Sequence, residues 1–287
     1  QAEDGIRDSV ASRGLGDVYK RQEYAMALPT EIISFMLGIP VEHRHKLRQY
    51  SLNILGALDP VVSQERLDEG NFSVEEFGEV LSQIIDRRRS ERTPKSDGEI
   101  LMSLILGDVN GRRLTNTELI QNCIFLLNAG HETTTSMVAN SMHMFFSAPD
   151  QLNLLKENPD LITTAIEEGL RYESPLQVGN RVTTGAVEIG GELLPTGTYI
   201  HTSIAGANRD PAEFNKPEEI DITRKPNRHI AFAMGHHVCL GATLARMEGR
   251  IAIGELVKRF PKIQQTGPAI SMGLARFRGF NNMPVKI

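Results

Sequence analysis

A cysteine in a glycine-containing turn, directly before an amphipathic helical pattern, constrains this chain more than any other feature. Cys239 lies in residues 232–241, which read FAMGHHVCLG. Gly235 and Gly241 carry no Cβ, so the backbone can turn tightly, approach a flat ligand and point amide N–H groups at the sulfur. Apolar residues then repeat at helical spacing from Leu244 to Phe260, which places the sulfur near a helix N-terminus, where the dipole favours an anion. This setting favours a metal-binding thiolate, and the alternative is a buried free cysteine at a turn.

Composition indicates a globular protein and argues against several other classes. The chain has 287 residues, of which 40% are hydrophobic, enough for a large core in one or two domains. The 31 basic and 36 acidic residues are interspersed and give a net charge of −5, which does not support nucleic-acid binding. Only two cysteines occur, Cys123 and Cys239, which fits a reducing compartment. No apolar run reaches about 18 residues and no signal-peptide pattern is present, so we expect a soluble cytoplasmic protein without membrane contact.

Helical periodicity dominates the chain before Pro175. Thr115 and Glu118 form a capping box that opens a long helix, and this helix can continue to Ala148, before Pro149. The charge run at residues 87–89 is expected to form a solvated helix end rather than a binding patch, because cations suit the C-terminal dipole. Further helices are predicted over Thr30–Leu37, His45–Leu58, Val74–Arg89 and Ile162–Tyr172.

The centre of the long helix carries an unusual group of side chains. Ala129 and Gly130 are small enough to let a flat ligand pack against the backbone. Thr133 can donate to a carbonyl within the helix and open a local kink. The alternative is an ordinary helix in which Glu132 lies at the surface and Thr133 has no role.

Two weaker signals follow. Glu168 and Arg171 are three residues apart, share a helix face and can form a bidentate ion pair. Gly169 between them is expected to lower local stability by up to about 1 kcal/mol relative to a helix-forming residue. After Pro175, short strand-like runs alternate with glycine- and proline-containing turns. Strands are predicted over Leu176–Thr184, Val187–Ile189 and Tyr199–Ile204.

The pattern F-x-x-G-x-H-x-C-x-G at residues 232–241 resembles the haem-binding loop of the cytochrome P-450 family. Other segments resemble the family in the same order, over almost all of residues 23–287. Ala233 departs from the family's usual glycine, a change expected to cost little room. The resemblance implies a mainly α cytochrome P-450 fold, an α-helical domain with a small β subdomain, whose first helices are missing. Residues 1–22 lack any period and are expected to be a non-native leader before a partial domain.

The resemblance also implies roles for individual residues. The Cys239 thiolate would bind the iron of haem b, and Glu132 and Thr133 would relay protons to oxygen. His131 is expected to serve packing or a substrate contact rather than iron. Other expected haem contacts are Ala129, Gly130, Arg181, His229, Phe232, Gly235, His237 and Gly241, with Arg181, His229 and His237 on the propionates. Glu168, Arg171 and Arg224 would lock the fold, and Phe125, Asn128, Leu176, Val178 and Phe277 would line the substrate pocket.

The function implied by the resemblance is that of a soluble bacterial-type monooxygenase, which inserts one atom of O2 into a small lipophilic organic substrate. Electrons would come from a ferredoxin or flavodoxin served by an NAD(P)H-dependent reductase, docking near Arg246 and Arg250. Two alternatives stay open: a peroxide-driven haem-thiolate enzyme, and a truncated, catalytically incompetent haem-binding fragment. The presence of Glu132 and Thr133 argues against the peroxide-driven enzyme.

Overall fold

The computed structural model describes residues 19–20, 24–91, 99–108 and 110–287. They belong to two compact units, Gln1–Thr135 and Ser136–Ile287, and each unit is described by itself. The expected leader over residues 1–22 lies outside the described residues, apart from Tyr19–Lys20, which form the short strand β1.

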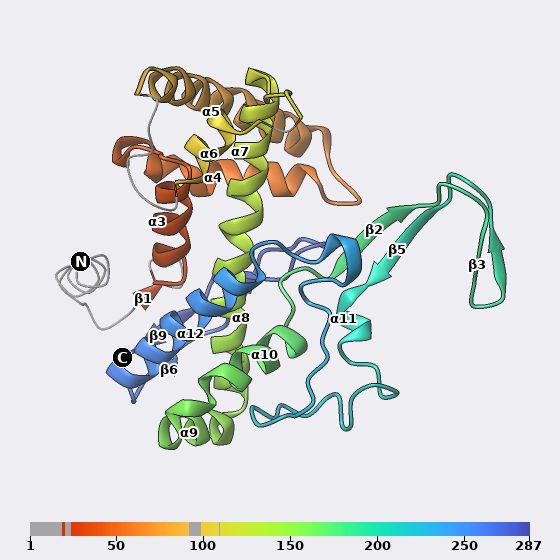
Figure 1. Cartoon of the computed structure of the whole chain (residues 1–287). Helices are drawn as coiled ribbons and strands as arrows, with labels where there is room; N and C mark the ends of the chain where they lie inside the picture. Colours follow the sequence, from red (N-terminus) through yellow and green to blue (C-terminus); the bar gives the residue numbers. More distant parts are fainter. Residues whose placement is uncertain (1–18, 21–23, 92–98, 109) are drawn as a thin grey trace. The chain divides into compact units, whose positions relative to one another are not determined.

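Helices make up most of the described first unit (Figure 1). The three helices predicted before residue 100 are present, but α5 begins at Gln64 rather than at Val74. Its first turns pack through small residues, because a Cβ on Gly70 would lie 2.5 Å from the Cβ of Ala57 in α4. The predicted start at Val74 rested on the spacing of large apolar residues, and that spacing does not reveal packing through small residues. The helices are α3 (Ala27–Met36), α4 (Val41–Ala57), α5 (Gln64–Glu91), α6 (Ile100–Leu106) and α7 (Asn116–Gly130).

An apolar core joins α3, α4, α5 and α7. Tyr50 of α4 stacks on Phe77 of α5 with ring centroids 5.3 Å apart. Cys123 of α7 lies in the same core with no exposed surface, and burial raises the pKa of its thiol to about 12. This cysteine is therefore a small apolar side chain of the core.

The prediction of a solvated arginine run at the end of α5 is wrong for its central member. Arg88 is only 1% exposed. Its Nε donates to Glu99 Oε1 over 2.8 Å, its Nη2 pairs with the second oxygen of Glu99, and its Nη1 pairs with Glu91. The helical period places one arginine of three on the buried face, and Glu99 makes that burial possible by balancing the charge.

The second unit combines helices with short strands. The predicted helix over Ile162–Tyr172 is confirmed as α10, with those bounds. The long helix predicted to end before Pro149 is divided at His131 into α7 and α8, and α8 ends at Ser147. The helices after α7 are α8 (Glu132–Ser147), α9 (Pro149–Glu157), η1 (Pro159–Leu161), α10 (Ile162–Tyr172), α11 (Ile204–Ala207), η2 (Gly235–His237) and α12 (Ala242–Arg259).

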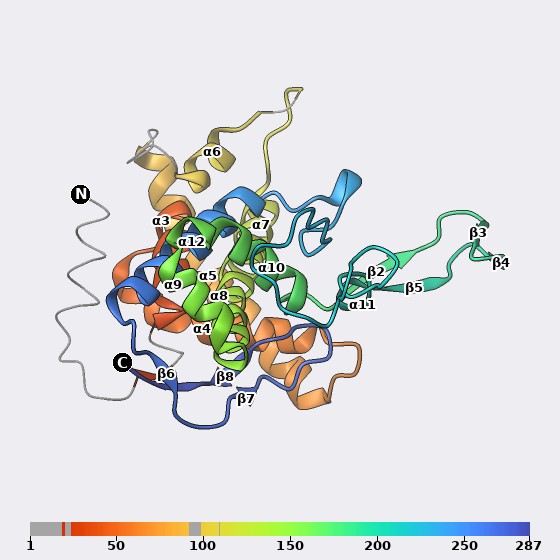
Figure 2. The ribbon, with the colours of Figure 1, turned by 90° about the horizontal axis from the view of Figure 1, so that it is seen from below.

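Short strands separated by turns are present, as predicted, and those of the second unit pair antiparallel. Strand β2 (Val178–Val182) pairs with β5 (Tyr199–Ser203), and the β3–β4 hairpin continues outward from them (Figure 2). Gly190 and Gly191 both have positive φ, which suits a two-residue hairpin turn. The remaining strands are β3 (Val187–Ile189), β4 (Glu192–Leu194), β6 (Gln264–Gln265), β7 (Ile270–Ser271), β8 (Phe280–Asn282) and β9 (Pro284–Lys286). No helix among the described residues is both long and apolar enough to cross a membrane.

Candidate functional site

The Cys239 loop, residues 232–241, is a closed turn that leads into α12. The Cys239 N–H donates to the carbonyl of Phe232 over 2.8 Å, and the Ala242 N–H donates to the Cys239 carbonyl over 3.2 Å. Gly235 has φ +71°, a left-handed torsion that favours glycine as expected, whereas the φ of −83° at Gly241 is open to any residue. A Cβ at Gly241 would lie 4.0 Å from Cys239 Sγ. The loop thus presents its thiol at an exposed position.

Ala233 is the strained position of this loop. Its φ is +58°, in the left-handed region that alanine rarely adopts. We expected alanine to be tolerated here because its side chain is small. The conformational cost lies instead in the backbone torsion. The Ala233 N–H donates to the Ile230 carbonyl over 2.9 Å and so fixes the turn.

The side chains around the thiol suit haem. Met234, Val238 and Leu240 are 74%, 58% and 96% exposed. Porphyrin supplies four nitrogen ligands and a broad apolar face, so it asks of the protein one further donor and apolar contacts. A single thiol among exposed apolar side chains matches that requirement.

A carboxylate on α10 connects the elements around the loop. Glu167 accepts hydrogen bonds from Arg246 Nε (2.7 Å) and Nη2 (2.9 Å), and its Oε2 lies 3.0 Å from His229 Nε2. Arg246 in turn lies over the Phe232 ring, 4.5 Å from its centroid. Burial pushes the pKa of Glu167 upward, but the bonds from His229 and Arg246 outweigh burial and lower that pKa to about 2.

These contacts change two expectations. His229 Nδ1 accepts the N–H of Ala231 over 3.2 Å, so Nε2 carries the proton and donates to Glu167. The structure therefore gives His229 a protein partner at each nitrogen instead of leaving one for a propionate. Arg246 has its charge balanced by Glu167, which weakens the expectation of a docking patch at Arg246 and Arg250.

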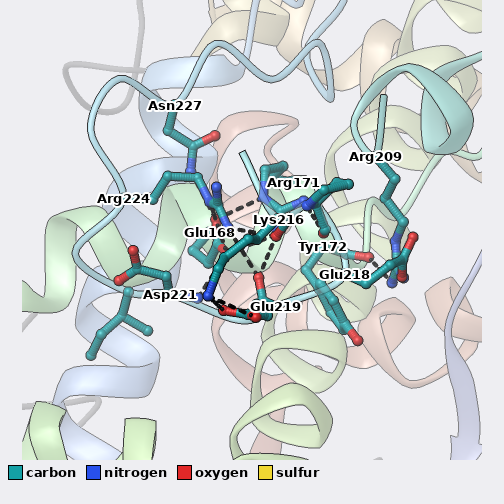
Figure 3. Close-up of polar contacts among 12 residues, drawn as sticks. Glu168, Arg171, Tyr172, Arg209, Lys216, Glu218, Glu219, Asp221, Arg224 and Asn227 are labelled. Carbon is teal, nitrogen blue, oxygen red and sulfur yellow. Dashed lines mark hydrogen bonds and ion pairs between the residues drawn. The ribbon is translucent and has the colours of Figure 1, made fainter. Parts of the chain in front are cut away.

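The second carboxylate of α10, Glu168, lies at the centre of a buried polar network (Figure 3). Arg171 Nε and Nη2 each donate to Glu168 over 2.8 Å, as the three-residue spacing predicts. Arg224 Nε lies 3.1 Å from Glu168 Oε2, and Asn227 donates to the same oxygen over 3.1 Å. Arg171 also donates to the carbonyls of Asn208, Pro217 and Glu219. The network fixes residues 208–227 against α10 and exposes no group for chemistry.

Gly169 has a packing role that helix propensity did not reveal. A Cβ at this position would lie 2.4 Å from Ser141 Oγ and 3.1 Å from Ser141 Cβ in α8. The expectation that a helix-forming residue would serve better is therefore wrong. Glycine is needed because α10 and α8 approach closely there.

Other expected haem and pocket residues of the second unit lie near the surface. Arg181 on β2 is exposed and donates to its neighbouring carbonyl at Asn180 over 2.8 Å, and His237 is exposed on η2. Leu176 and Phe277, both partly buried, are brought together by an antiparallel β-bridge, and Val178 begins β2. The haem and substrate roles of these residues remain predictions.

The first unit contains the predicted irregularity between α7 and α8. His131 separates the two helices, and Thr133 Oγ1 donates to the Ala129 carbonyl over 2.5 Å, as expected for a threonine that competes for a helix carbonyl. Glu132 is 2% exposed, which excludes the alternative of a surface glutamate. His131 is fully buried, with Nε2 2.9 Å from Thr30 Oγ1, so it serves packing.

The remaining residues expected near haem or substrate differ in their burial and in their contacts. A Cβ on Gly130 would lie 3.3 Å from Ile33 Cδ1, so the glycine also suits close packing against α3, and its expected haem contact remains a prediction. Ala129 and Phe125 are exposed on α7. Asn128 is 7% exposed and donates to the Ile124 carbonyl over 2.8 Å, while its Oδ1 has no hydrogen-bond partner among the described residues.

Glu167 is the important residue that sequence reasoning missed. Its partners His229 and Arg246 lie far along the chain, so no local spacing reveals the contact. The available signal was the second carboxylate of the Glu167-Glu168 pair, which faces a different side of α10 from Glu168.

The chain is similar to known proteins over most of its length. The family model described as "Cytochrome P450" matches residues 48–274. The biotin biosynthesis cytochrome P450 of Bacillus subtilis (strain 168) is 39% identical over 84% of this chain and 60% of its own length. A second cytochrome P450 of that organism is 38% identical over 92% of this chain and 63% of its own length.

Solved structures give the same likeness. A crystal structure of P450BioI in complex with acyl carrier protein carrying hexadec-9Z-enoic acid has a TM-score of 0.91 and 34% sequence identity. The match covers 99% of this chain and 72% of that chain. The present chain therefore spans about three fifths of the length of the curated relatives it matches.

Proposed function

The chain belongs to the cytochrome P450 family, and from this membership we propose that it is a haem-dependent monooxygenase that uses Cys239 as its iron ligand. Proteins of this family bind haem, and thiolate-bound haem supplies activation of O2. One oxygen atom enters an organic substrate, and two electrons and two protons convert the other into water. The observation that best supports this proposal is the closed Cys239 loop, with its exposed thiol among exposed apolar side chains.

The residues of this chain have separate tasks in the proposal. The loop holds the sulfur in place through the bond from the Cys239 N–H to the Phe232 carbonyl. Thr133 and Glu132 match the family's alcohol–acid pair, and we assign them to the delivery of protons to oxygen. The hydroxyl of Thr133 can exchange its present acceptor, the Ala129 carbonyl, for another one. Arg181 and His237 are exposed donors suited to carboxylates of the propionate kind.

The electron donor is proposed to be a ferredoxin or flavodoxin served by an NAD(P)H-dependent reductase, with all partners in the cytoplasm. The substrate is proposed to be a lipophilic organic molecule. This follows from family membership and from the apolar character of Phe125, Leu176, Val178 and Phe277. Asn128 Oδ1, which has no partner among the described residues, supplies an acceptor for a polar group of that molecule.

A carrier-bound fatty acyl chain is a second candidate form of the substrate. It is favoured by the likeness to the P450BioI structure, which is described with an acyl carrier protein. Titration of the haem-loaded chain with a free C16 fatty acid and with the same acid on acyl carrier protein separates the two forms. A change in the haem absorbance at lower concentration for the carrier-bound acid supports this candidate, and a preference for the free acid contradicts it.

The test of the iron ligand uses both cysteines of the chain. The haem-loaded protein, reduced under carbon monoxide, should give the thiolate-type absorbance band. Cys239→Ser should abolish the band, because a serine hydroxyl stays protonated and is a poor iron donor. Cys123→Ala is the matched control and should keep the band, because Cys123 is a buried core residue. Retention of the band in Cys239→Ser would exclude Cys239 as the ligand.

The same preparation separates monooxygenase from peroxide-driven chemistry. Product formation from a lipophilic substrate should require O2, reduced ferredoxin or flavodoxin, and NAD(P)H. Product formed at equal rate from hydrogen peroxide alone would favour the peroxide-driven alternative. A chain that binds haem but forms no product under either condition would be the catalytically incompetent fragment.

A further inference from the structure

We propose that Glu167 is a positioning residue that holds the Cys239 loop in its strained conformation. The inference rests on the proposed function in taking Cys239 as the iron ligand. It concerns a residue outside the Glu168–Arg171–Arg224 network and outside the loop itself.

One carboxylate joins three elements. Glu167 belongs to α10, Arg246 belongs to α12, which follows the loop, and His229 belongs to the segment that precedes the loop. Both oxygens of Glu167 are used, one by Arg246 Nε and the other by Arg246 Nη2 and His229 Nε2. The two ends of the loop are therefore tied to the same anion by charge-assisted or ring N–H hydrogen bonds.

The contacts continue from this anion to the cysteine. The Arg246 guanidinium lies between Glu167 and the Phe232 ring, 4.5 Å from the ring centroid. The carbonyl of Phe232 accepts the N–H of Cys239. A change at Glu167 thus reaches the backbone of Cys239 through Arg246 and Phe232, each step being a contact given by the structure.

The loop needs such support because Ala233 directly follows Phe232 and has φ +58°. A non-glycine residue in the left-handed region persists only where neighbouring contacts fix its conformation. Without Glu167, Arg246 would lose its bidentate partner and the Phe232 ring its cover, so Ala233 could relax. The loop amides would then open more often.

The experiment measures amide hydrogen exchange of the full chain without haem, by mass spectrometry of a peptide spanning residues 229–241. Glu167→Gln keeps the side-chain size and removes the charge. It should speed exchange of this peptide on the order of tenfold, the size expected when a charge-assisted hydrogen bond is lost. Glu255→Gln is the matched control, because Glu255 pairs with Arg259 on α12 away from the loop, and it should leave the peptide unchanged. Unchanged exchange in Glu167→Gln would overturn the proposal.

A double-mutant cycle distinguishes positioning from general destabilisation. Ala233→Gly removes the strain, so Glu167→Gln should have a much smaller effect on exchange in the Ala233→Gly background. Equal effects in both backgrounds would overturn the proposal. If Glu167→Gln does not fold, Arg246→Lys takes its place, since lysine keeps the charge but loses the bidentate fork and the stacking. The same dependence on Ala233→Gly is then expected.

The haem-loaded variants supply a spectroscopic readout. The share of protein giving the thiolate-type band under carbon monoxide should fall in Glu167→Gln and recover in the double variant with Ala233→Gly. An unaltered chain that gives no such band would contradict the proposed function, while the exchange experiment would still decide the role of Glu167.

Discussion

At the scale of single residues, Ala233 and Thr133 both depend on the local backbone: Ala233 on its torsion angle, and Thr133 on the carbonyl to which its side chain donates. Ala233 has φ +58° in the Cys239 loop, and Thr133 donates from its side chain to the carbonyl of Ala129. The first stores strain in the loop that carries the candidate iron ligand. The second places a hydroxyl at the break between two helices, where its hydrogen bond can be exchanged.

Replacement of Ala233 by glycine should stabilise the protein. Ala233→Gly removes a left-handed penalty of about 1–2 kcal/mol, part of which is offset by the greater freedom of glycine in the unfolded chain. We expect the free energy of unfolding, measured with denaturant, to rise by about 1 kcal/mol. Ala231→Gly is the matched control, because Ala231 is not among the residues with positive φ, and it should destabilise slightly. Equal changes in both variants would show that the torsion is not the cause.

Loss of the Thr133 hydroxyl should uncouple electron use from product formation. Thr133→Ala should keep haem and the thiolate-type band, while less product forms for each reductant consumed and peroxide accumulates, because proton delivery is impaired. The control is Thr135→Ala, which removes a similar bond from Thr135 Oγ1 to the His131 carbonyl on the same helix. Identical coupling in Thr133→Ala and the unaltered enzyme would remove Thr133 from the mechanism.

At the scale of elements, α10 carries two carboxylates with different partners on neighbouring positions. Glu168 fixes Arg171 and Arg224, and Glu167 fixes His229 and Arg246. Gly169, the next residue, lets the helix approach Ser141 of α8. Three consecutive residues of one helix thus face three different parts of the second unit.

Alanine at position 169 should destabilise this helix contact despite its higher helix propensity. Gly169→Ala would place a Cβ 3.1 Å from Ser141 Cβ. Overpacking of this kind costs about 1–3 kcal/mol, which exceeds the propensity gain of up to about 1 kcal/mol. The control is Gly254→Ala in α12, where the nearest atom, Ile162 Cγ1, would be 3.8 Å away, so the variant should be stabilised. Thermal unfolding measures both, and stabilisation by Gly169→Ala would refute the close approach.

The elements also show which features the sequence could predict. The bounds of α10 and the capping box of Thr115 and Glu118 are determined by neighbours within a few residues, so periodicity and spacing were sufficient. Helix α5 began earlier than predicted because its first turns pack through Gly70 and Ser73 rather than through large apolar side chains. Local pattern carries no information about a partner helix that tolerates only small residues.

At the scale of the whole molecule, polar contacts between segments that are separate in the sequence are the features that could not be predicted. Glu168 and Arg171 lie on one helix, so their contact followed from spacing, and the resemblance supplied Arg224. The partners of Glu167, and the partner Glu99 of Arg88, could not be found in this way, because each of these contacts depends on how separate segments fold together. Mainly helical architecture and short strands between turns were predictable, since they sum over many local signals.

Stability of the whole chain should depend on pH through two carboxylates with opposite shifts. Hydrogen bonds lower the pKa of Glu167 to about 2, so its contribution is present above pH 4.5 and is lost as pH falls from 4.5 toward 2. Burial alone raises the pKa of Glu248 to about 7, and Glu248 is 3% exposed. Between pH 4.5 and 7 the folded state keeps a proton that the unfolded state releases, so stability falls as pH rises.

Glu248→Gln isolates the second of these effects. Glutamine mimics the protonated acid, so the variant should be more stable than the unaltered chain at pH 8, by about 3 kcal/mol, with the difference vanishing below about pH 5. Denaturant unfolding at several pH values measures this. Glu255→Gln on the same helix is a half-buried control that pairs with Arg259 and is expected to show no such trend. A pH-independent difference for Glu248→Gln would mean that its carboxyl does not take up a proton in the folded state.

The buried pair of Arg88 and Glu99 has a consequence for how this sequence can diverge. Loss of either partner alone breaks a buried ion pair, at a cost of about 3–5 kcal/mol, whereas two apolar residues of similar volume can replace both at little cost. Single substitutions at these positions are therefore unfavourable intermediates. Among descendants of a common ancestor, positions 88 and 99 should change together or not at all, and this covariation would reveal the contact from sequences alone.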